Sequence, residues 1–280
     1  MEIAKKLLIK DWTASKTSII FDSFSNKFIE KEYILNSNPY FSNELEIYEE
    51  ILCSLSIDAA KIIESEINGN KVSFILEYIN GIDCSENPNS DFLYLAAEKA
   101  GEIYKKSARN IDKIESKYID KYSLTKEKVF KSLEFLGKFF EFNNTDFLIE
   151  KIFFDFKEKE LFVNHFDMHL KNFIFNNGKI CLIDWASMLI SPFYCDLYIL
   201  LSQAEEINAS KNKIIEIYEK ASHMSISEKD IIASGIIYSI ISVERLLRIS
   251  TPEKSFFFDW AKDLYKDLME LLIKINSQLE

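Results

Sequence analysis

The segment from residue 165 to residue 185 constrains the fold most, because it joins two polar motifs through a hairpin signal. It begins His165-Phe-Asp-Met-His-Leu-Lys-Asn172 and ends Ile183-Asp184-Trp185. Between these motifs, apolar runs at 173–175 and 180–183 flank Asn176-Asn177-Gly178, which predicts a small hairpin. Asp167 and Asn172 therefore share a tight loop, and Asp184 ends a following strand.

The spacing of Asp167, Asn172 and Asp184 is typical of phosphoryl transfer. That reaction needs a carboxylate to take the proton of an acceptor hydroxyl, and metal ions to neutralise phosphate charge. Mg²⁺ prefers hard oxygen ligands and keeps several waters, so the Asn172 and Asp184 side chains would suffice together with phosphates. The alternative is that all three are turn-forming polar residues at strand ends.

The pattern H-x-D-x-H-x-x-N followed by I-D-W resembles the aminoglycoside phosphotransferase and choline kinase superfamily, which has the protein-kinase-like fold. The resemblance implies that Asp167 is the catalytic base and that Asn172 and Asp184 hold Mg²⁺, with two ions expected. It also implies ATP or GTP as the co-substrate.

Three further residues near the motifs receive structural roles. The resemblance makes His165 a scaffold residue that braces the loop against the Asp184 segment, and it gives His169 no clear chemical role. Asp196 matches a superfamily position, where we expect it to bond backbone groups near the catalytic loop. The alternative for Asp196 is a surface helix cap.

The first eighty residues predict three strands, a helix and two strands. The strands are expected at 6–12, 17–24, 27–35, 62–67 and 72–79, the last two joined by Asn68-Gly69. Asn38 and Pro39 would begin the helix, whose apolar positions are Phe41, Leu45, Tyr48 and Leu52.

The chain after residue 80 reads as mostly helical. Helices are expected at 91–107, 125–142, 231–248 and 256–275, with Ser227 and Asp230 capping the third, and a strand at 161–163. The order of elements predicts an α+β fold, and the resemblance implies a bilobal, protein-kinase-like fold with an N-terminal five-stranded antiparallel sheet and one helix and a larger, mostly helical C-terminal lobe. We place the nucleotide-binding lobe, including its hinge, at 1–80 and the catalytic and substrate-binding lobe at 81–280.

Lys31 is the candidate phosphate-binding lysine. In the third strand it shares a face with Ile29, Tyr33 and Leu35, and a Lys within an apolar stripe needs an anion. Glu44 lies towards the inner face of the following helix and is the expected partner, with Glu49 as its rival. The alternative is that Lys31 belongs to a solvated strand.

The remaining nucleotide-binding candidates come from a covering loop, a hinge and two apolar walls. The loop is Thr13-Ala14-Ser15-Lys16, which lacks the G-x-G-x-x-G of protein kinases. In the hinge, backbone groups of Glu77 and Ile79 would pair with a purine edge. Plain core packing is the alternative to base contact for the wall residues, which are Ile29, Ile174 and Ile183.

Composition limits the partners. The formal net charge of −11 disfavours nucleic acid and is compatible with a cationic acceptor. The start of the chain lacks a signal-peptide pattern and no apolar run could span a bilayer, so we expect a cytoplasmic protein without membrane contact. The four cysteines show no zinc-ligand spacing. The oligomeric state is open between monomer and homodimer.

The acceptor is expected to bind over the C-terminal lobe beside Asp167. Glu244, Asp259 and Trp260 are the acceptor-binding candidates, with ordinary helix-surface positions or a local ion pair to Arg245 or Arg248 as the alternative. The sequence thus predicts a small-molecule kinase, acting on an aminoglycoside in antibiotic resistance or on a choline-like, ethanolamine-like or sugar metabolite. A protein kinase is disfavoured by Trp185 and the lack of an A-P-E segment, and a catalytically silent nucleotide-binding domain by the intact triad of motif residues.

Overall fold

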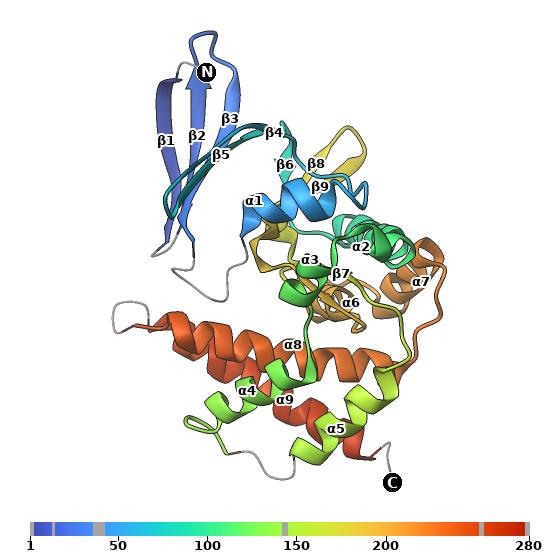
Figure 1. The fold of residues 1–280 in the computed structure, drawn as a ribbon. Helices are drawn as coiled ribbons and strands as arrows, with labels where there is room; N and C mark the ends of the chain where they lie inside the picture. The colour runs from blue at the N-terminus through green and yellow to red at the C-terminus, as the bar shows by residue number, and fades with distance from the viewer. Residues whose placement is uncertain (1–2, 13–14, 36–42, 142–144, 252–254, 278–280) are drawn as a thin grey trace. The chain divides into compact units, whose positions relative to one another are not determined.

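The computed structural model describes residues 3–12, 15–35, 43–141, 145–251 and 255–277 (Figure 1). The chain forms two compact units. The first comprises Met1–Pro88 and Leu170–Ser187, and the second comprises Asn89–His169 and Met188–Glu280. The sequence-based division at residue 80 differs from this arrangement. The segment after the hinge pairs with the hairpin at 173–182, and this pairing draws both into the first unit.

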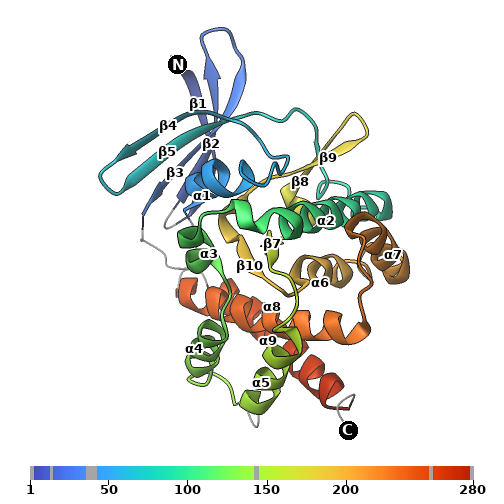
Figure 2. The same ribbon diagram turned by 45° about the vertical axis from the view of Figure 1, so that its right-hand side comes forward.

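The first unit contains the expected five-stranded antiparallel sheet (Figures 1 and 2). Its strands are β1 (Ile3–Trp12), β2 (Ser15–Asp22), β3 (Lys27–Ile34), β4 (Ile62–Asn68) and β5 (Lys71–Glu77), in the order β1-β2-β3-β5-β4. The Asp22 carboxylate ends β2 early by accepting the backbone N–H groups of Phe24 and Asn26, at 2.9 and 2.8 Å. Strand β5, which lies between β3 and β4, buries Val72, Phe74 and Leu76.

One helical segment accompanies this sheet. It consists of α1 (Glu44–Glu46) and a continuing π-helical turn, η1 (Ile47–Leu52). The expected apolar positions Leu45, Tyr48 and Leu52 are buried, whereas the predicted start at Asn38, Pro39 and Phe41 lies outside the described residues. Among the described residues the Asn43 side chain caps α1 by accepting the Glu46 N–H at 3.3 Å.

A small second sheet completes the first unit. Strands β6 (Ile82–Asp83), β8 (Phe173–Asn176) and β9 (Lys179–Leu182) lie in the order β6-β8-β9. The predicted hairpin is confirmed, with positive φ at Asn177 (47°) and Gly178 (79°) as its turn requires. Gly81 permits the approach to β8, because a Cβ there would lie 2.4 Å from the Phe175 carbonyl oxygen.

The second unit is mostly helical, as expected. Its helices are α2 (Ser90–Asn110), α3 (Ser116–Tyr122), α4 (Lys126–Leu136), α5 (Thr145–Phe156), α6 (Cys195–Ser202), α7 (Lys211–Ser222), α8 (Glu228–Ile249) and α9 (Phe256–Ser277). The helix expected at 125–142 was too long, because α4 ends at Leu136, where Gly137 follows and the chain turns. Within the described ranges, no helix is long and apolar enough to cross a membrane.

Helix α8 lies at the centre of the second unit and packs against α4, α6 and α9. It runs beside α9 in both views (Figures 1 and 2). Ile236, Ile237 and Ile240 are fully buried on it, and the predicted cap is present as a reciprocal bond pair between Ser227 and Asp230. The short strand β7 (Phe162–Asn164) pairs with β10 (Leu189–Ser191) and leads directly into the loop that carries Asp167.

Candidate active site

Lys31 lies at the centre of an ionic cluster in the first unit. Its side chain extends from β3, its residue is 9% exposed, and its Nζ donates to Glu44 Oε1 at 2.5 Å and to Asp184 Oδ1 at 2.8 Å. Burial alone would lower the pKa of Lys31, but the carboxylates of Asp184 and Glu44 outweigh it and raise that pKa. Lys31 is therefore a fixed cation, and the solvated-strand alternative is wrong.

Glu44 is the partner of Lys31, as helix periodicity indicated. The buried Glu44 carboxylate also accepts the backbone N–H of Trp185 at 3.2 Å, so it ties α1 to the turn after β9. Burial raises the pKa of Glu44 despite the opposing effect of Lys31. The rival Glu49 instead accepts a hydrogen bond from the Ser65 hydroxyl at 3.3 Å.

Asp184 and Asn172 lie at the same end of the β8–β9 hairpin. The Ile183 N–H donates to the Asn172 carbonyl at 2.9 Å, and Asp184 then turns the chain with a left-handed φ of 64°. The Asp184 carboxylate contacts Lys31 and also Lys10, whose Nζ lies 3.3 Å from Oδ2. A β1 lysine at this carboxylate was not foreseen from the sequence.

The oxygen donors at this hairpin fit Mg²⁺. An amide oxygen and a carboxylate are the hard ligands that this ion prefers, and it commonly takes only one or two protein carboxylates besides phosphates. The part of the chain that the structure describes contains no group of three or more His, Cys, Asp or Glu side chains able to hold a metal by themselves. The donor set therefore fits a metal shared with phosphates better than a closed protein cage.

In the second unit, Asp196 holds the loop that precedes Asp167. Its buried carboxylate accepts the backbone N–H of His165 at 2.7 Å and that of Phe166 at 2.8 Å, which is the contact expected from the sequence. Burial raises the pKa of Asp196 to about 7, although both hydrogen bonds oppose the shift. Phe166 adopts a left-handed φ of 64°, so the two bonds stabilise a backbone that a non-glycine residue rarely adopts.

Asp167 itself is partly exposed at the tip of this loop. Its backbone N–H donates to Nδ1 of the fully buried His165 at 3.3 Å, and its Oδ1 lies 3.7 Å from His169 Nε2. His165 thus supports the loop from beneath, in keeping with a scaffold role. Its expected packing against the Asp184 segment stays a prediction.

Helix α8 contributes two side chains to this loop that sequence reasoning missed. The Phe166 ring packs against Tyr238 with centroids 5.3 Å apart, and the Arg245 guanidinium lies 4.9 Å from the centroid of the same ring. Burial lowers the pKa of Arg245 to about 10, which nearby Asp167 partly offsets. The only sequence signal for Arg245 was its basic character within an apolar helix.

The acceptor-binding candidates differ in their surroundings. Glu244 is buried, and its carboxylate accepts Arg248 Nε and Nη2 at 2.9 and 2.8 Å and the Ser132 hydroxyl at 2.5 Å. This local network, anticipated as the alternative, accounts for the burial without a ligand. Asp259 and Trp260 are exposed near the start of α9, where Trp260 is 53% exposed and packs edge-on against Phe256.

The other nucleotide-binding candidates all belong to the first unit. Ser15 begins β2 and is exposed, whereas Thr13 and Ala14 lie outside the described residues. Ile29 lies in β3 and Ile174 in β8, and Ile183 follows β9; all three are half-buried. The base-contact and core alternatives for them both stay open.

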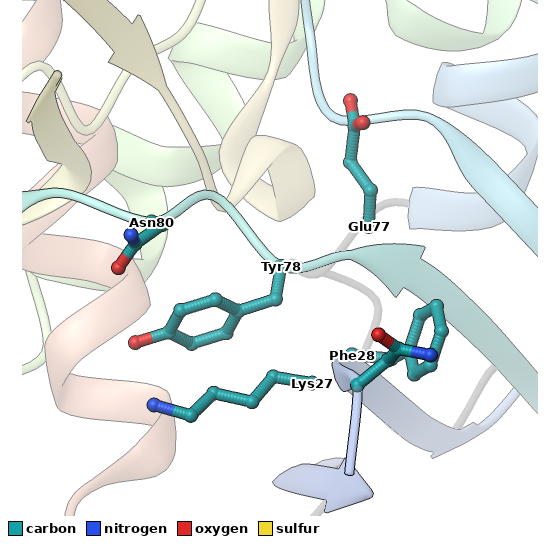
Figure 3. A pocket seen from close by; sticks show the side chains of 6 residues that line it. Lys27, Phe28, Glu77, Tyr78 and Asn80 are labelled. Carbon is teal, nitrogen blue, oxygen red and sulfur yellow. The ribbon is translucent and has the colours of Figure 1, made fainter. Parts of the chain in front are cut away.

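The predicted hinge borders an open depression of about 470 Å³ (Figure 3). In it the Lys27 Nζ lies 5.2 Å from the centroid of the Tyr78 ring. The Glu77 N–H already donates to the Lys61 carbonyl at 2.9 Å, and its carboxylate accepts the Lys61 N–H at 2.9 Å. Because this N–H is already paired, a purine at Glu77 would have to donate a hydrogen bond to the Glu77 carbonyl. The lining residues are Asn26, Lys27, Phe28, Glu77, Tyr78 and Asn80.

Comparison with known proteins supports the resemblance drawn from the motifs. The model of the phosphotransferase enzyme family matches residues 140–219, which include Asp167, Asn172, Asp184 and Asp196. A comparison with curated proteins found no significant match.

Solved structures share the fold over nearly the whole chain. An amicoumacin kinase complex is 14% identical, covers 94% of this chain and 88% of its own, and has a TM-score of 0.63. An ethanolamine kinase from Plasmodium vivax is 15% identical, covers 95% and 81%, and has a TM-score of 0.66. A spectinomycin phosphotransferase complex is 12% identical, covers 95% and 90%, and has a TM-score of 0.62.

The protein-kinase-like fold is thus confirmed, as is the resemblance to the aminoglycoside phosphotransferase and choline kinase superfamily.

Proposed function

We propose that this protein transfers the γ-phosphoryl group of ATP or GTP to a hydroxyl group of a small molecule. One observation carries the proposal: the Lys31 Nζ is buried between the carboxylates of Glu44 and Asp184, at 2.5 and 2.8 Å. A lysine fixed by a helix glutamate, beside an aspartate available to a metal ion, is the arrangement that phosphoryl transfer requires in kinases.

Asp167 is the proposed catalytic base. It would accept the proton of the acceptor hydroxyl while that oxygen forms a bond to the γ-phosphorus and the bond from this phosphorus to the β–γ bridging oxygen breaks. Asp196 and His165 support this role, because they fix the backbone from which Asp167 projects. The leaving nucleoside diphosphate keeps the electron pair of the broken bond.

Asn172 and Asp184 are the proposed ligands of Mg²⁺, with two ions expected. The ions would neutralise charge on the phosphates. The similar solved structures include complexes with AMP-PNP and with ADP, which supports a nucleotide as the co-substrate. Lys31 and Glu44 then belong to the phosphate-binding set, with Ser15 at the covering loop. The proposed base site consists of Glu77, Ile79, Ile29, Ile174 and Ile183.

The acceptor we propose is a small molecule with an amino group, such as an aminoglycoside or a choline-like or ethanolamine-like amino alcohol. Support comes from neighbours named for spectinomycin and for ethanolamine, and from the formal net charge of −11. Asp259 and Trp260 are the exposed candidates to contact it. Glu244 is the weaker candidate, because Arg248 and Ser132 already occupy its carboxylate. A sugar acceptor is the alternative.

The direct test is product formation. The protein is incubated with Mg²⁺ and ATP or GTP and a panel of aminoglycosides, amino alcohols and sugars, and phosphorylated product is detected by mass. We expect Asp167→Asn to lower kcat about 10²- to 10⁴-fold without changing nucleotide affinity. Asp146→Asn, an exposed α5 position, is the matched control. Full activity in the Asp167 variant would contradict the proposed base.

A further inference from the structure

Lys10 supplies a second cation to the Asp184 carboxylate. Its Nζ lies 3.3 Å from Asp184 Oδ2, while Lys31 takes the other oxygen, Oδ1, at 2.8 Å. The two lysines differ in exposure, because the Lys10 side chain is 43% exposed and that of Lys31 only 11%. Lys31 is therefore held in place by its surroundings. The exposed ammonium group of Lys10 can leave the Asp184 carboxylate and bind another anion with little loss of free energy.

A bulge in β1 directs Lys10 to this carboxylate. Leu8 pairs with Ser18 and Lys10 pairs with Thr17, so Ile9 is an extra residue opposite a single step of β2. Thr17 in turn pairs with Lys31 of β3. Lys10, Thr17 and Lys31 therefore form one row across three strands, and directly paired residues have their side chains on the same face.

The opposite face of the sheet shows what the bulge changes. Lys6 pairs with Ile20 in β2, and its ammonium group binds the carboxylates of Glu30 and Glu32. In a regular strand Lys10 would share this face with Lys6, because four residues is an even number of steps. The extra residue Ile9 shifts the alternation of side chains by one position, so Lys10 lies on the same face of the sheet as Lys31.

We propose that Lys10 is a second phosphate-binding lysine, which contacts the polyphosphate of the bound nucleotide together with Lys31. The inference rests on the proposed function. Its physical basis is that a metal ion and the two lysines would compete for the Asp184 carboxylate. A carboxylate that binds a metal ion no longer neutralises two ammonium groups, so these groups would then bind phosphate instead. Lys10 also lies at the end of β1, two residues before the paired Trp12 and Ser15, where the covering loop is expected.

The experiment compares Lys10→Met with Lys6→Met, a lysine-to-methionine change in the same strand but on the other face. Affinities for AMP-PNP with Mg²⁺ and for adenosine are measured by isothermal titration calorimetry on the full chain. We expect Lys10→Met to weaken AMP-PNP binding about tenfold and to leave adenosine binding unchanged, because adenosine has no phosphate. Lys10→Arg should retain most of the affinity, and Lys6→Met should bind both ligands like the unaltered protein.

The outcomes separate this inference from the function on which it rests. If the unaltered protein binds AMP-PNP and Lys10→Met binds it equally well or more tightly, Lys10 only shields Asp184 and the inference is wrong. An equal loss of adenosine affinity would also overturn it, because the effect would then be a distortion of the base site. If the unaltered protein binds neither AMP-PNP nor the corresponding guanosine analogue with Mg²⁺, the proposed function itself fails; if it binds only the guanosine analogue, that analogue and guanosine replace AMP-PNP and adenosine in the same comparison. Thermal denaturation confirms that each variant is folded.

Discussion

Glu44 in the first unit and Asp196 in the second are both buried carboxylates, but they are satisfied in different ways. Glu44 binds the Lys31 cation and one backbone N–H, that of Trp185. Asp196 instead binds two backbone N–H groups, those of His165 and Phe166. Burial raises the pKa of both groups, and only for Glu44 does a cation oppose the rise.

The two carboxylates therefore hold different things, a cation in one case and a stretch of backbone in the other. An ion pair holds a charge in place, and a lysine that shares two carboxylates can respond when a polyphosphate arrives. A carboxylate bound to consecutive backbone amides instead fixes the path of the chain, here the left-handed turn at Phe166. The first unit therefore positions a cation, and the second positions the backbone that carries Asp167.

The largest expected effect comes from removing the shared cation. Lys31→Met leaves the Glu44 carboxylate buried without its cation, and breaking a buried pair in this way costs about 3–5 kcal/mol. We expect a loss of this order in the free energy of unfolding, measured by urea denaturation, together with loss of AMP-PNP binding measured by calorimetry.

The double variant Lys31→Met with Glu44→Gln sharpens this prediction. It removes the unpaired charge, so we expect it to recover part of the stability but none of the nucleotide affinity. If the single variant is as stable as the unaltered protein, the buried ion pair does not hold the first unit together as described.

The next effect comes from Asp196→Ala. It leaves the buried N–H groups of His165 and Phe166 without their acceptor, and each unsatisfied group costs about 1–3 kcal/mol. We expect about 3 kcal/mol of destabilisation by urea denaturation. Asp196→Asn keeps one acceptor oxygen and should lose about half as much. Equal stability of both variants and the unaltered protein would falsify the backbone-fixing role.

The contrast also explains what could be predicted from the sequence. Strand alternation placed Lys31 in an apolar stripe, and helical spacing selected Glu44 over Glu49, because both patterns are local. The Asn-Gly signal likewise located the hairpin before Asp184. The contact from Asp196 to the loop spans about thirty residues and came only through the family resemblance.

Lys10 and Arg245 could not be predicted for two different reasons. The bulge at Ile9 depends on how β1 pairs with β2, and a regular alternation would have placed Lys10 on the wrong face. Arg245 reaches Phe166 only because α8 packs in the core of the second unit, an arrangement of tertiary structure. Glu244 shows the converse, since its place in an apolar helix suggested an acceptor contact, whereas its carboxylate binds Arg248, the alternative drawn from the sequence, and Ser132 of α4.

A pH titration tests the effect of burial on the pKa of Asp196. Its folded-state pKa of about 7 lies above the unfolded value of about 3.9, so the folded protein binds the extra proton between these values. The contribution of Asp196 to stability is therefore present at low pH and is lost as the pH rises through about 7. The stability of the unaltered protein should fall relative to Asp196→Asn by at most about 1.4 kcal/mol per pH unit in this window. The free energy of unfolding of both proteins is measured by urea denaturation from pH 5 to pH 8. If the two values change in parallel with pH, the expected shift at Asp196 is wrong.

The smallest expected effect tests whether Glu244 belongs with the structural carboxylates or with the acceptor site. Ser132→Ala removes one of its hydrogen bonds but leaves both bonds from Arg248. We expect a loss of about 1 kcal/mol in the free energy of unfolding and an unchanged KM for the acceptor. Ser202→Ala is a control, because that hydroxyl donates to the Ile199 carbonyl within its own helix. If the Ser132 variant has a raised KM for the acceptor and no loss of stability, Glu244 contributes to acceptor binding.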